Sequence, residues 1–168
     1  MQNWVKEKKL KAYVTPGGHR RVRKEDLQAF MREFGMPIPP HVAETRPFVL
    51  IVDDEPEVLD MLKMILESQE EKLDIATAQS GVEALLLIGE KKPDLLILDI
   101  MLPGMNGIEV CTKLKSSPTT HNIKIVAITG IHDPTLRDRI LNAGADLFLT
   151  KPLDVLEFRK ASLRLIHR

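Results

Sequence analysis

The fold is decided by residues 48–54, which read FVLIVDD: five consecutive apolar residues followed by two aspartates. A short apolar run of this kind is typical of a strand that is buried on both faces of a parallel sheet. Three further apolar runs occur along the chain, and each is followed by a polar residue. They are residues 95–98 before Asp99, 125–128 before Thr129, and 147–150 before Lys151.

The segments between these runs predict helices, because their apolar residues recur at helical spacing. The expected helices cover 55–68, 81–90, 107–115, 134–143 and 154–167, and residues 73–78 predict one more short strand. This alternation indicates an α/β fold with a five-stranded parallel sheet covered by helices on both faces. The carboxyl ends of parallel strands meet at one edge, where α/β proteins bind ligands. We therefore expect three carboxylates, one hydroxyl and one ammonium in a single crevice suited to a cation and a phosphoryl group.

Composition excludes several classes of protein. The chain has 168 residues, 43% of them hydrophobic, which is enough for one ordinary domain and a small appendage. Its single cysteine, Cys111, excludes a disulfide framework and a multi-cysteine metal site. No apolar run approaches the roughly eighteen residues of a membrane span, and the basic N-terminus has no signal-peptide core. We expect a cytoplasmic protein.

Charge divides the chain into two unlike parts. Residues 1–46 contain ten basic and five acidic residues, whereas residues 47–168 contain fourteen basic and nineteen acidic ones. Four prolines within residues 37–47 favour an extended connector at the junction. We therefore expect a basic segment at 1–36, a proline-rich linker at 37–46 and an acidic domain at 47–168.

The acidic domain carries four motifs in a fixed order. They are Asp53-Asp54, the stretch DIMLPGMNG at 99–107, Thr129-Gly130, and the stretch FLTKP at 148–152. In these motifs the domain resembles the receiver domain of two-component response regulators. The resemblance implies a doubly wound, flavodoxin-like sheet with strand order 2-1-3-4-5, in which the first and third strands lie side by side.

The resemblance also implies a role for each polar residue at the strand ends. Asp54 and Asp99 would bind Mg²⁺ or another divalent cation directly, with the carbonyl of Met101 as a third ligand and Asp53 acting through water. Asp99 would accept a phosphoryl group from the phosphohistidine of a sensor histidine kinase or phosphotransfer protein. Lys151 would offset the negative charge of the phosphoryl group.

Two further residues would convert phosphorylation into a change of shape. By the resemblance, the Thr129 hydroxyl would bond a phosphoryl oxygen, and the Phe148 ring would turn into the space that it leaves. The altered surface would lie on the helix at 134–143 with the fifth strand and the fifth helix, where family members commonly form homodimers or bind partners. Such a protein would catalyse only its own phosphorylation and dephosphorylation, and so would not be an enzyme.

The basic segment predicts a hairpin followed by a helix. Residues 10–15 and 19–23 would be the strands, joined by a glycine turn, and a helix would run from Lys24 to a cap at Gly35. The stretch TPGGHRR at 15–21 resembles the wing of MerR-like and excisionase-like DNA-binding domains. The cations that would contact DNA phosphates are Lys11, His19, Arg20, Arg21 and Arg23.

The start of the chain departs from that resemblance. In those domains a helix-turn-helix precedes the wing, whereas only about nine residues precede this hairpin, so residues 2–8 are expected to be at most the tail of a recognition helix. The chain is then either a shortened form of a longer regulator or a remnant that has lost autonomous DNA recognition. A solvated basic hairpin with no nucleic-acid role is a third possibility. We expect four aromatic residues, Trp4, Tyr13, Phe30 and Phe34, to form a small core.

Alternatives remain open at this point. Asp53 or Asp54 could cap the helix that follows, Lys151 could simply end a strand, and Phe148 could be an ordinary core residue. The leading function is a phosphorylated response regulator that acts on DNA, and the second is a receiver whose surface is itself the output. A phosphatase with an aspartyl-phosphate intermediate lacks its Asp-x-Asp motif here. A dinucleotide-binding protein lacks its glycine fingerprint.

Overall fold

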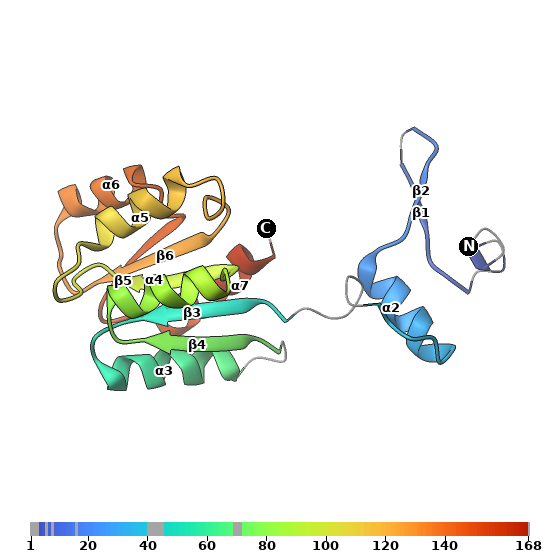
Figure 1. Cartoon of the computed structure of the whole chain (residues 1–168), viewed down its shortest axis with the longest axis horizontal. Helices are drawn as coiled ribbons and strands as arrows, with labels where there is room; N and C mark the ends of the chain where they lie inside the picture. Colours follow the sequence, from blue (N-terminus) through green and yellow to red (C-terminus); the bar gives the residue numbers. More distant parts are fainter. Residues whose placement is uncertain are drawn as a thin grey trace. The chain divides into compact units, whose positions relative to one another are not determined.

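A computed structural model of the protein describes residues 4–5, 7, 9–15, 17–39, 46–68 and 72–167. The chain divides into two compact units, Met1–Thr45 and Arg46–Arg168, whose elements are labelled in Figure 1. Much of the expected recognition-helix tail, Pro16 of the wing motif and most of the proline-rich linker lie outside the described residues, so the expectations for these segments stay predictions.

The larger unit contains a five-stranded sheet in which all neighbouring strands run parallel. The strands are β3 (Phe48–Val52), β4 (Asp74–Ala78), β5 (Leu95–Asp99), β6 (Lys124–Thr129) and β7 (Leu147–Thr150). Their order is β4-β3-β5-β6-β7, so β3 and β5 are adjacent although β4 lies between them in the chain. The expected α/β fold and strand order are confirmed.

Two-sided burial explains the continuous apolar runs. Every residue of β3 and β5 is buried, and alternate residues face opposite sides of the sheet. Leu50 and Val52 therefore belong to the hydrophobic core on one face, whereas Val49 and Ile51 belong to the core on the other. β4 lies at the edge of the sheet, and only its last residue, Ala78, is buried.

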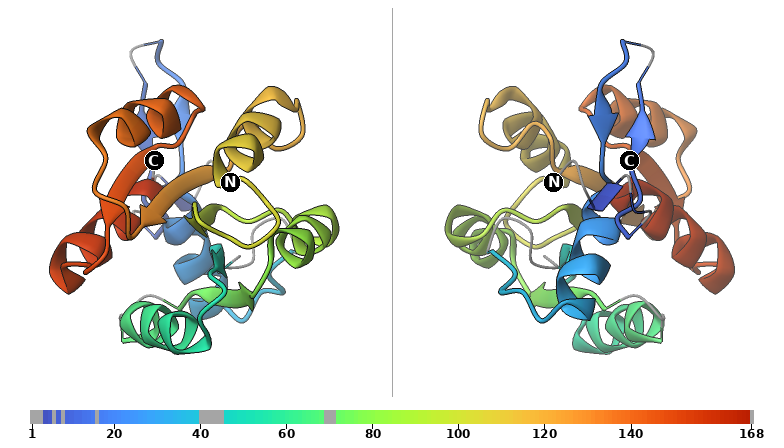
Figure 2. Two further views of the ribbon diagram at one scale, coloured as in Figure 1. Left: turned by 90° about the vertical axis from the view of Figure 1, so that its left-hand side faces the viewer. Right: turned by 90° about the vertical axis from the view of Figure 1, so that its right-hand side faces the viewer.

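Helices cover both faces of the sheet. They are α3 (Pro56–Glu67), α4 (Gly81–Glu90), α5 (Gly107–Ser116), α6 (Pro134–Asn142) and α7 (Val155–Ile166). Figure 2 shows α3 and α7 on one face of the sheet and α4, α5 and α6 on the other. Apolar side chains of these helices pack against the sheet in two separate hydrophobic clusters, one on each face. The ends of these helices and strands differ from the sequence expectations by one residue at most. None of the helices that the structure describes has the length and apolarity needed to cross a bilayer.

Polar side chains begin four of these helices. The N-caps of α4, α5, α6 and α7 each accept a hydrogen bond from a first-turn backbone N–H, and they are Ser80, Asn106, Asp133 and Asp154. The N-cap of α3 is Glu55, whose side chain makes no capping bond, and Pro56 occupies the first turn. The alternative that Asp53 or Asp54 caps this helix is therefore wrong.

An ion cluster joins the amino ends of β6 and β7. Asp146 Oδ2 accepts hydrogen bonds from Lys115 Nζ at 2.8 Å and from the Ile125 N–H at 3.0 Å, and its Oδ1 accepts one from Lys124 Nζ at 3.3 Å. Burial alone would raise the pKa of Asp146, but these hydrogen bonds outweigh it and hold the pKa below its ordinary value. This cluster fixes the start of two strands at the edge opposite the expected site.

The smaller unit contains a hairpin followed by a helix, as expected, but the two described strands have two residues each and are shorter than the predicted 10–15 and 19–23. The hairpin pairs β1 (Tyr13–Val14) with β2 (Arg20–Arg21), and the Thr15 N–H donates to His19 O at 2.9 Å across the turn. Gly18 has φ 78°, which favours glycine at this position of the turn. Helix α2 (Lys24–Glu33) follows, and beyond its end the Met36 N–H bonds Met31 O at 2.8 Å. Gly35 thus stands at the expected end of the helix.

Aromatic contacts in this unit differ in part from the expectation. The ring of Phe30 is 5.1 Å from that of Trp4 and 4.6 Å from that of Phe34, centroid to centroid, and Phe30 is buried. Tyr13 remains 44% exposed, and the guanidinium carbon of Arg23 lies 4.6 Å from its ring centroid. Tyr13 therefore packs against a cation, because its two-residue strand offers no buried surface.

Candidate functional site

The carboxyl ends of β3, β5 and β7 bring three of the expected side chains into direct contact. Lys151, just after β7, donates hydrogen bonds to Asp53 Oδ2 at 2.8 Å and to Asp99 Oδ2 at 2.7 Å. The lysine lies 98 positions from Asp53 and 52 positions from Asp99 along the chain. Folding of the sheet therefore brings these three residues together. We call Asp53, Asp54, Asp99 and Lys151 the acidic site.

Asp54 completes a group of three carboxylates. One carboxylate oxygen from each of Asp53, Asp54 and Asp99 lies within 4.8 Å of the other two. Asp53 and Asp99 are buried, whereas Asp54 is exposed. Among the described residues, Lys151 supplies the ammonium group that bonds two of these carboxylates. Three carboxylates face one ammonium group, so negative charge is in excess. Carboxylate oxygens are the ligands that Mg²⁺ prefers, and the donor set fits a divalent cation.

Backbone N–H groups orient the two buried carboxylates. Asp53 Oδ1 accepts a hydrogen bond from the Glu55 N–H at 3.0 Å, and Asp99 Oδ1 accepts one from the Met101 N–H at 2.7 Å. Each of these bonds spans two residues, so the turn after the strand makes it locally. One oxygen of each aspartate is therefore held by the backbone, while the other, Oδ2, points at Lys151.

In the acidic site, burial and hydrogen bonding shift the pKa values of Asp53 and Lys151 in opposite directions. Burial raises the pKa of Asp53 above its ordinary value, although the hydrogen bonds from Lys151 and from the Glu55 N–H oppose this. Burial alone would lower the pKa of Lys151, but its bonds to Asp53 and Asp99 dominate and raise it. Lys151 is therefore a permanent cation at neutral pH.

Glu55 contacts the acidic site but was not predicted to do so. Its Oε1 lies 3.5 Å from Lys151 Nζ, and its side chain is 62% exposed. One signal for this contact is that Glu55 directly follows the two aspartates. The same position directly precedes a helix, so the sequence pattern alone does not separate a site residue from an ordinary helix start.

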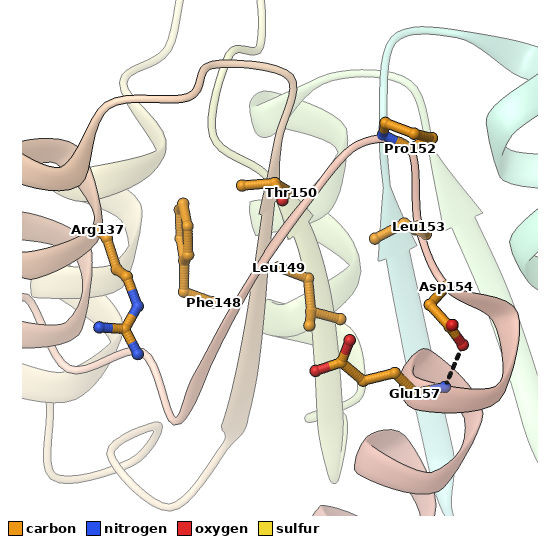
Figure 3. A pocket seen from close by; sticks show the side chains of 8 residues that line it. All are labelled: Arg137, Phe148, Leu149, Thr150, Pro152, Leu153, Asp154 and Glu157. Atoms are coloured by element: carbon orange, nitrogen blue, oxygen red, sulfur yellow. Dashed lines mark hydrogen bonds between the residues drawn. The ribbon is translucent and has the colours of Figure 1, made fainter.

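Thr129 is the last residue of β6 and Phe148 lies within β7, and neither has a described bond to the three carboxylates. Thr129 is fully buried, and its Oγ1 accepts a hydrogen bond from the Ile131 N–H at 3.2 Å. Phe148 is partly buried and lines a pocket of about 360 Å³. Figure 3 shows Phe148 on the side of β7 that faces Arg137, and Leu149 on the side of Glu157. The structure thus leaves free space beside the Phe148 ring.

The loop after Asp99 is tightly packed. Met101 is 54% exposed, and its N–H is engaged by Asp99. A Cβ atom at Gly107 would lie 2.7 Å from the Ile100 Cα, so the loop closes against α5 only with glycine there. This close approach fixes the backbone that would present the Met101 carbonyl.

The candidate DNA-binding cations belong to the smaller unit. All five side chains, Lys11, His19, Arg20, Arg21 and Arg23, are exposed. Arg20 and Arg21 form β2, whereas Arg23 lies at the start of α2 and stacks on Tyr13. These cations are therefore available to a polyanion, but they do not share one environment.

Comparison with known families supports both parts. Residues 49–162 match the model of the response regulator receiver domain, and residues 1–34 match that of a helix-turn-helix domain. The first match covers more than half of the chain, so the protein belongs to the response regulator receiver domain family. The two resemblances seen in the sequence are confirmed.

Individual relatives share the receiver part. The response regulator PleD of Caulobacter vibrioides is 41% identical over 106 residues, which are 63% of this chain and 23% of that protein. The phosphate regulon transcriptional regulatory protein PhoB of Rhizobium meliloti is 38% identical over 121 residues, which are 70% of this chain and 52% of that protein. The chain thus corresponds to about half or less of these relatives.

A solved structure matches the fold closely. The signal receiver domain of the DNA binding response regulator protein (merR) from Colwellia psychrerythraea 34H is 34% identical, with a TM-score of 0.70. The match covers 73% of this chain and 99% of that one.

Proposed function

We propose that the protein is a response regulator of a two-component phosphorelay, phosphorylated on Asp99 by a sensor histidine kinase or phosphotransfer protein in the cytoplasm. The observation that carries this proposal is the buried Asp99 carboxylate, 2.7 Å from Lys151 Nζ within a group of three carboxylates. Its domains are a DNA-directed segment at 1–36, a linker at 37–46 and a receiver at 47–168. It is not an enzyme beyond its own phosphorylation and dephosphorylation.

Phosphoryl transfer is a displacement at phosphorus. Asp99 Oδ2 forms the new O–P bond while the N–P bond of a phosphohistidine breaks, and the electron pair of that bond returns to the imidazole. The Met101 N–H keeps the second oxygen, Oδ1, in place during the step. Lys151 supplies positive charge beside the attacking oxygen, since such reactions depend on positioning and electrostatics.

A divalent cation, Mg²⁺ or another, completes the site in this proposal. Asp54 and Asp99 would bind it directly, Met101 would offer its carbonyl oxygen, and Asp53 would act through water. When bound, such a cation neutralises charge on the phosphoryl oxygens. The excess of carboxylate over ammonium in the acidic site supports this assignment.

Thr129 and Phe148 transmit the event to the surface. The phosphoryl group adds roughly −1.5 to −2 charge, and the Thr129 hydroxyl leaves the Ile131 N–H to bond one of its oxygens. Phe148 then turns inward from the pocket that it lines. The affected face comprises α6, β7 and α7, where a homodimer would form.

The output of the switch is proposed to be DNA binding by the basic segment. Its helix-turn-helix match and the five exposed cations support this role. Relatives named as transcriptional or DNA-binding regulators support it as well. The five cations are Lys11, His19, Arg20, Arg21 and Arg23.

Labelling with acetyl phosphate tests the proposal. In the presence of Mg²⁺ the native chain should gain the mass of one phosphoryl group, and Asp99→Asn should gain none. The matched control is Asp74→Asn, which changes an exposed aspartate at the start of β4 and should label normally. Stoichiometric labelling of Asp99→Asn, or labelling of the native chain that is undiminished by a chelator, would contradict the assignment.

The switch has its own test. Thr129→Ala should still accept the phosphoryl group but lose most of the phosphorylation-dependent change in amide exchange on α6 and β7. Thr135→Ala, on the first turn of α6, is the matched control and should keep that change. An undiminished change in Thr129→Ala would show that the signal takes another route.

A further inference from the structure

The pairing of the hairpin sorts its cations onto two faces. Tyr13 pairs with Arg21 and Val14 pairs with Arg20. Directly opposed residues on neighbouring strands point to the same face, and successive residues point to opposite faces. Arg21 therefore shares a face with Tyr13, which we call the Tyr13 face. Arg20 shares the other with Val14, which we call the Val14 face.

A third cation belongs to the Tyr13 face. The guanidinium carbon of Arg23 lies 4.6 Å from the Tyr13 ring centroid, so this side chain folds back over that face from the start of α2. The Tyr13 face thus presents two guanidinium groups. The Val14 face presents one, beside a valine that is 69% exposed. The two faces of the same short ribbon differ in both charge and polarity.

The stacking of Arg23 on Tyr13 is an ordering contact. A guanidinium can lie flat on an aromatic ring and still direct its N–H groups at a phosphate. Every residue of β1 and β2 is exposed, so the side chains of the hairpin otherwise have little packing to hold them. Tyr13 therefore holds Arg23 where Arg21 also projects, on the hairpin that Figure 1 shows extending away from α2.

We propose that the Tyr13 face of the hairpin is the surface that contacts the phosphates of duplex DNA. Arg21 and Arg23 are its contacting cations, and Tyr13 is a positioning residue that holds Arg23. The inference rests on the proposed DNA-directed function and refines it, because it makes Arg20 a lesser contributor. Charge complementarity selects the occupant: the phosphate backbone is a dense line of negative charge, and this face carries the denser positive charge.

A salt titration of duplex binding distinguishes the two faces. Each phosphate contact adds about −0.9 to the slope of log affinity against log salt. Arg21→Ala should flatten the slope by about 0.9, so that raising salt from about 50 to 200 mM weakens its binding about 3.5-fold less than that of the native chain. Arg20→Ala removes the same charge from the adjacent position and should flatten the slope by less than half as much. Lys113→Ala, on α5, should leave the slope unchanged.

The positioning role of Tyr13 is tested by measuring both the affinity for duplex DNA and its dependence on salt. Tyr13→Leu keeps every charge but releases Arg23, so affinity should fall about twofold to fivefold, the range of an exposed cation–π contact, with little change in slope. Tyr13→Phe keeps the ring and should bind like the native chain.

The outcomes separate this inference from the function on which it rests. Equal flattening by Arg20→Ala and Arg21→Ala would mean that both faces of the hairpin contact DNA, and would overturn the assignment of a single face. Native-level affinity in Tyr13→Leu would remove the role of Tyr13. Absence of any duplex binding by the native chain would overturn the DNA-directed function itself, and the face assignment with it.

Discussion

The two edges of the sheet each carry a cluster of lysine and aspartate, and the two clusters are balanced differently. At the amino edge one carboxylate, Asp146, receives two ammonium groups and a backbone N–H. At the carboxyl edge one ammonium, Lys151, is shared by Asp53 and Asp99, with Asp54 beside them. The pKa of Asp146 is accordingly held below its ordinary value, whereas burial raises that of Asp53.

This difference distinguishes a cluster with a structural role from the candidate functional site. The amino-edge cluster satisfies its carboxylate within the chain, so it needs nothing more to be stable. The carboxyl-edge cluster keeps an excess of negative charge in a partly buried place, which is unfavourable unless a further cation is recruited. The fold thus tolerates repulsion between carboxylates at the edge where a cation and a phosphoryl group are proposed to bind.

The largest effect is expected from removing the shared ammonium. Lys151→Ala leaves Asp53 and Asp99 buried without a cation, so the free energy of unfolding without divalent metal should fall by about 3 kcal/mol. Urea denaturation measures the loss, and added Mg²⁺ should return part of it by binding the folded state. The control Lys63→Ala breaks an exposed pair with Glu67 and should cost less than about 0.5 kcal/mol. An equal loss in the free energy of unfolding in the two variants would show that Lys151 stabilises the fold no more than an exposed lysine does.

The second effect concerns the amino edge. Asp146→Asn should lower the free energy of unfolding by about 2 kcal/mol at neutral pH, because it weakens two charged hydrogen bonds. The folded-state pKa of Asp146 lies below its ordinary value of 3.8, so its contribution is present above that pH and is lost as pH falls through the lowered value. Urea denaturation of both proteins at several pH values should show the difference shrinking only below about pH 4. A difference that is already absent at neutral pH would contradict the structural role.

A smaller effect is expected at the exposed member of the acidic site. Asp54→Asn removes one of three carboxylates and should weaken Mg²⁺ binding about tenfold, or 1.4 kcal/mol, while leaving metal-free stability unchanged or slightly higher. Isothermal calorimetry measures the affinity. Asp60→Asn, an equally exposed change on α3, is the control and should bind Mg²⁺ as the native chain does. Unaltered affinity in Asp54→Asn would exclude this residue as a ligand.

The smallest effect concerns the buried thiol of Cys111, which should react very slowly. Cys111 on α5 is fully buried, and burial raises the pKa of its thiol to about 11. At about pH 8 a thiol reagent should therefore modify it only through unfolding, much more slowly than a free cysteine. Lys151→Ala and Asp146→Asn should each accelerate this labelling by the factor by which they raise the unfolded fraction. Fast labelling of the native chain would show local opening around α5.

The strands, the helices and the meeting of three carboxylates with Lys151 were predictable from sequence. Buried apolar runs such as 48–52 and 95–98 have few alternatives to a central strand, and the polar residues after them must share an edge. The order of the strands, by contrast, came from the family resemblance. Nothing in the local pattern of β3 states that β5 is its neighbour, because the crossover is decided by packing over the whole sheet.

Other features could not be inferred because they depend on distant contacts. Asp146 precedes a strand and looks like an ordinary turn residue, yet its side chain binds Lys115 of α5. Glu55 reaches Lys151 across the sheet edge. Tyr13 was expected in a core, but its strand has only two residues, and a cation from the start of α2 takes the place of apolar neighbours. Sequence spacing does not report any of these three contacts.

The sequence separation of 98 residues between Asp53 and Lys151 has a consequence for the protein during its synthesis. A nascent chain that has emerged only as far as β6 already contains Asp53, Asp54 and Asp99, but it lacks the ammonium that is to be shared between two of them. Domains generally fold as units, and a long loop must close before this contact forms. We expect a partly made receiver to be unable to accept a phosphoryl group, so that unfinished chains on the ribosome would take none from the proposed kinase.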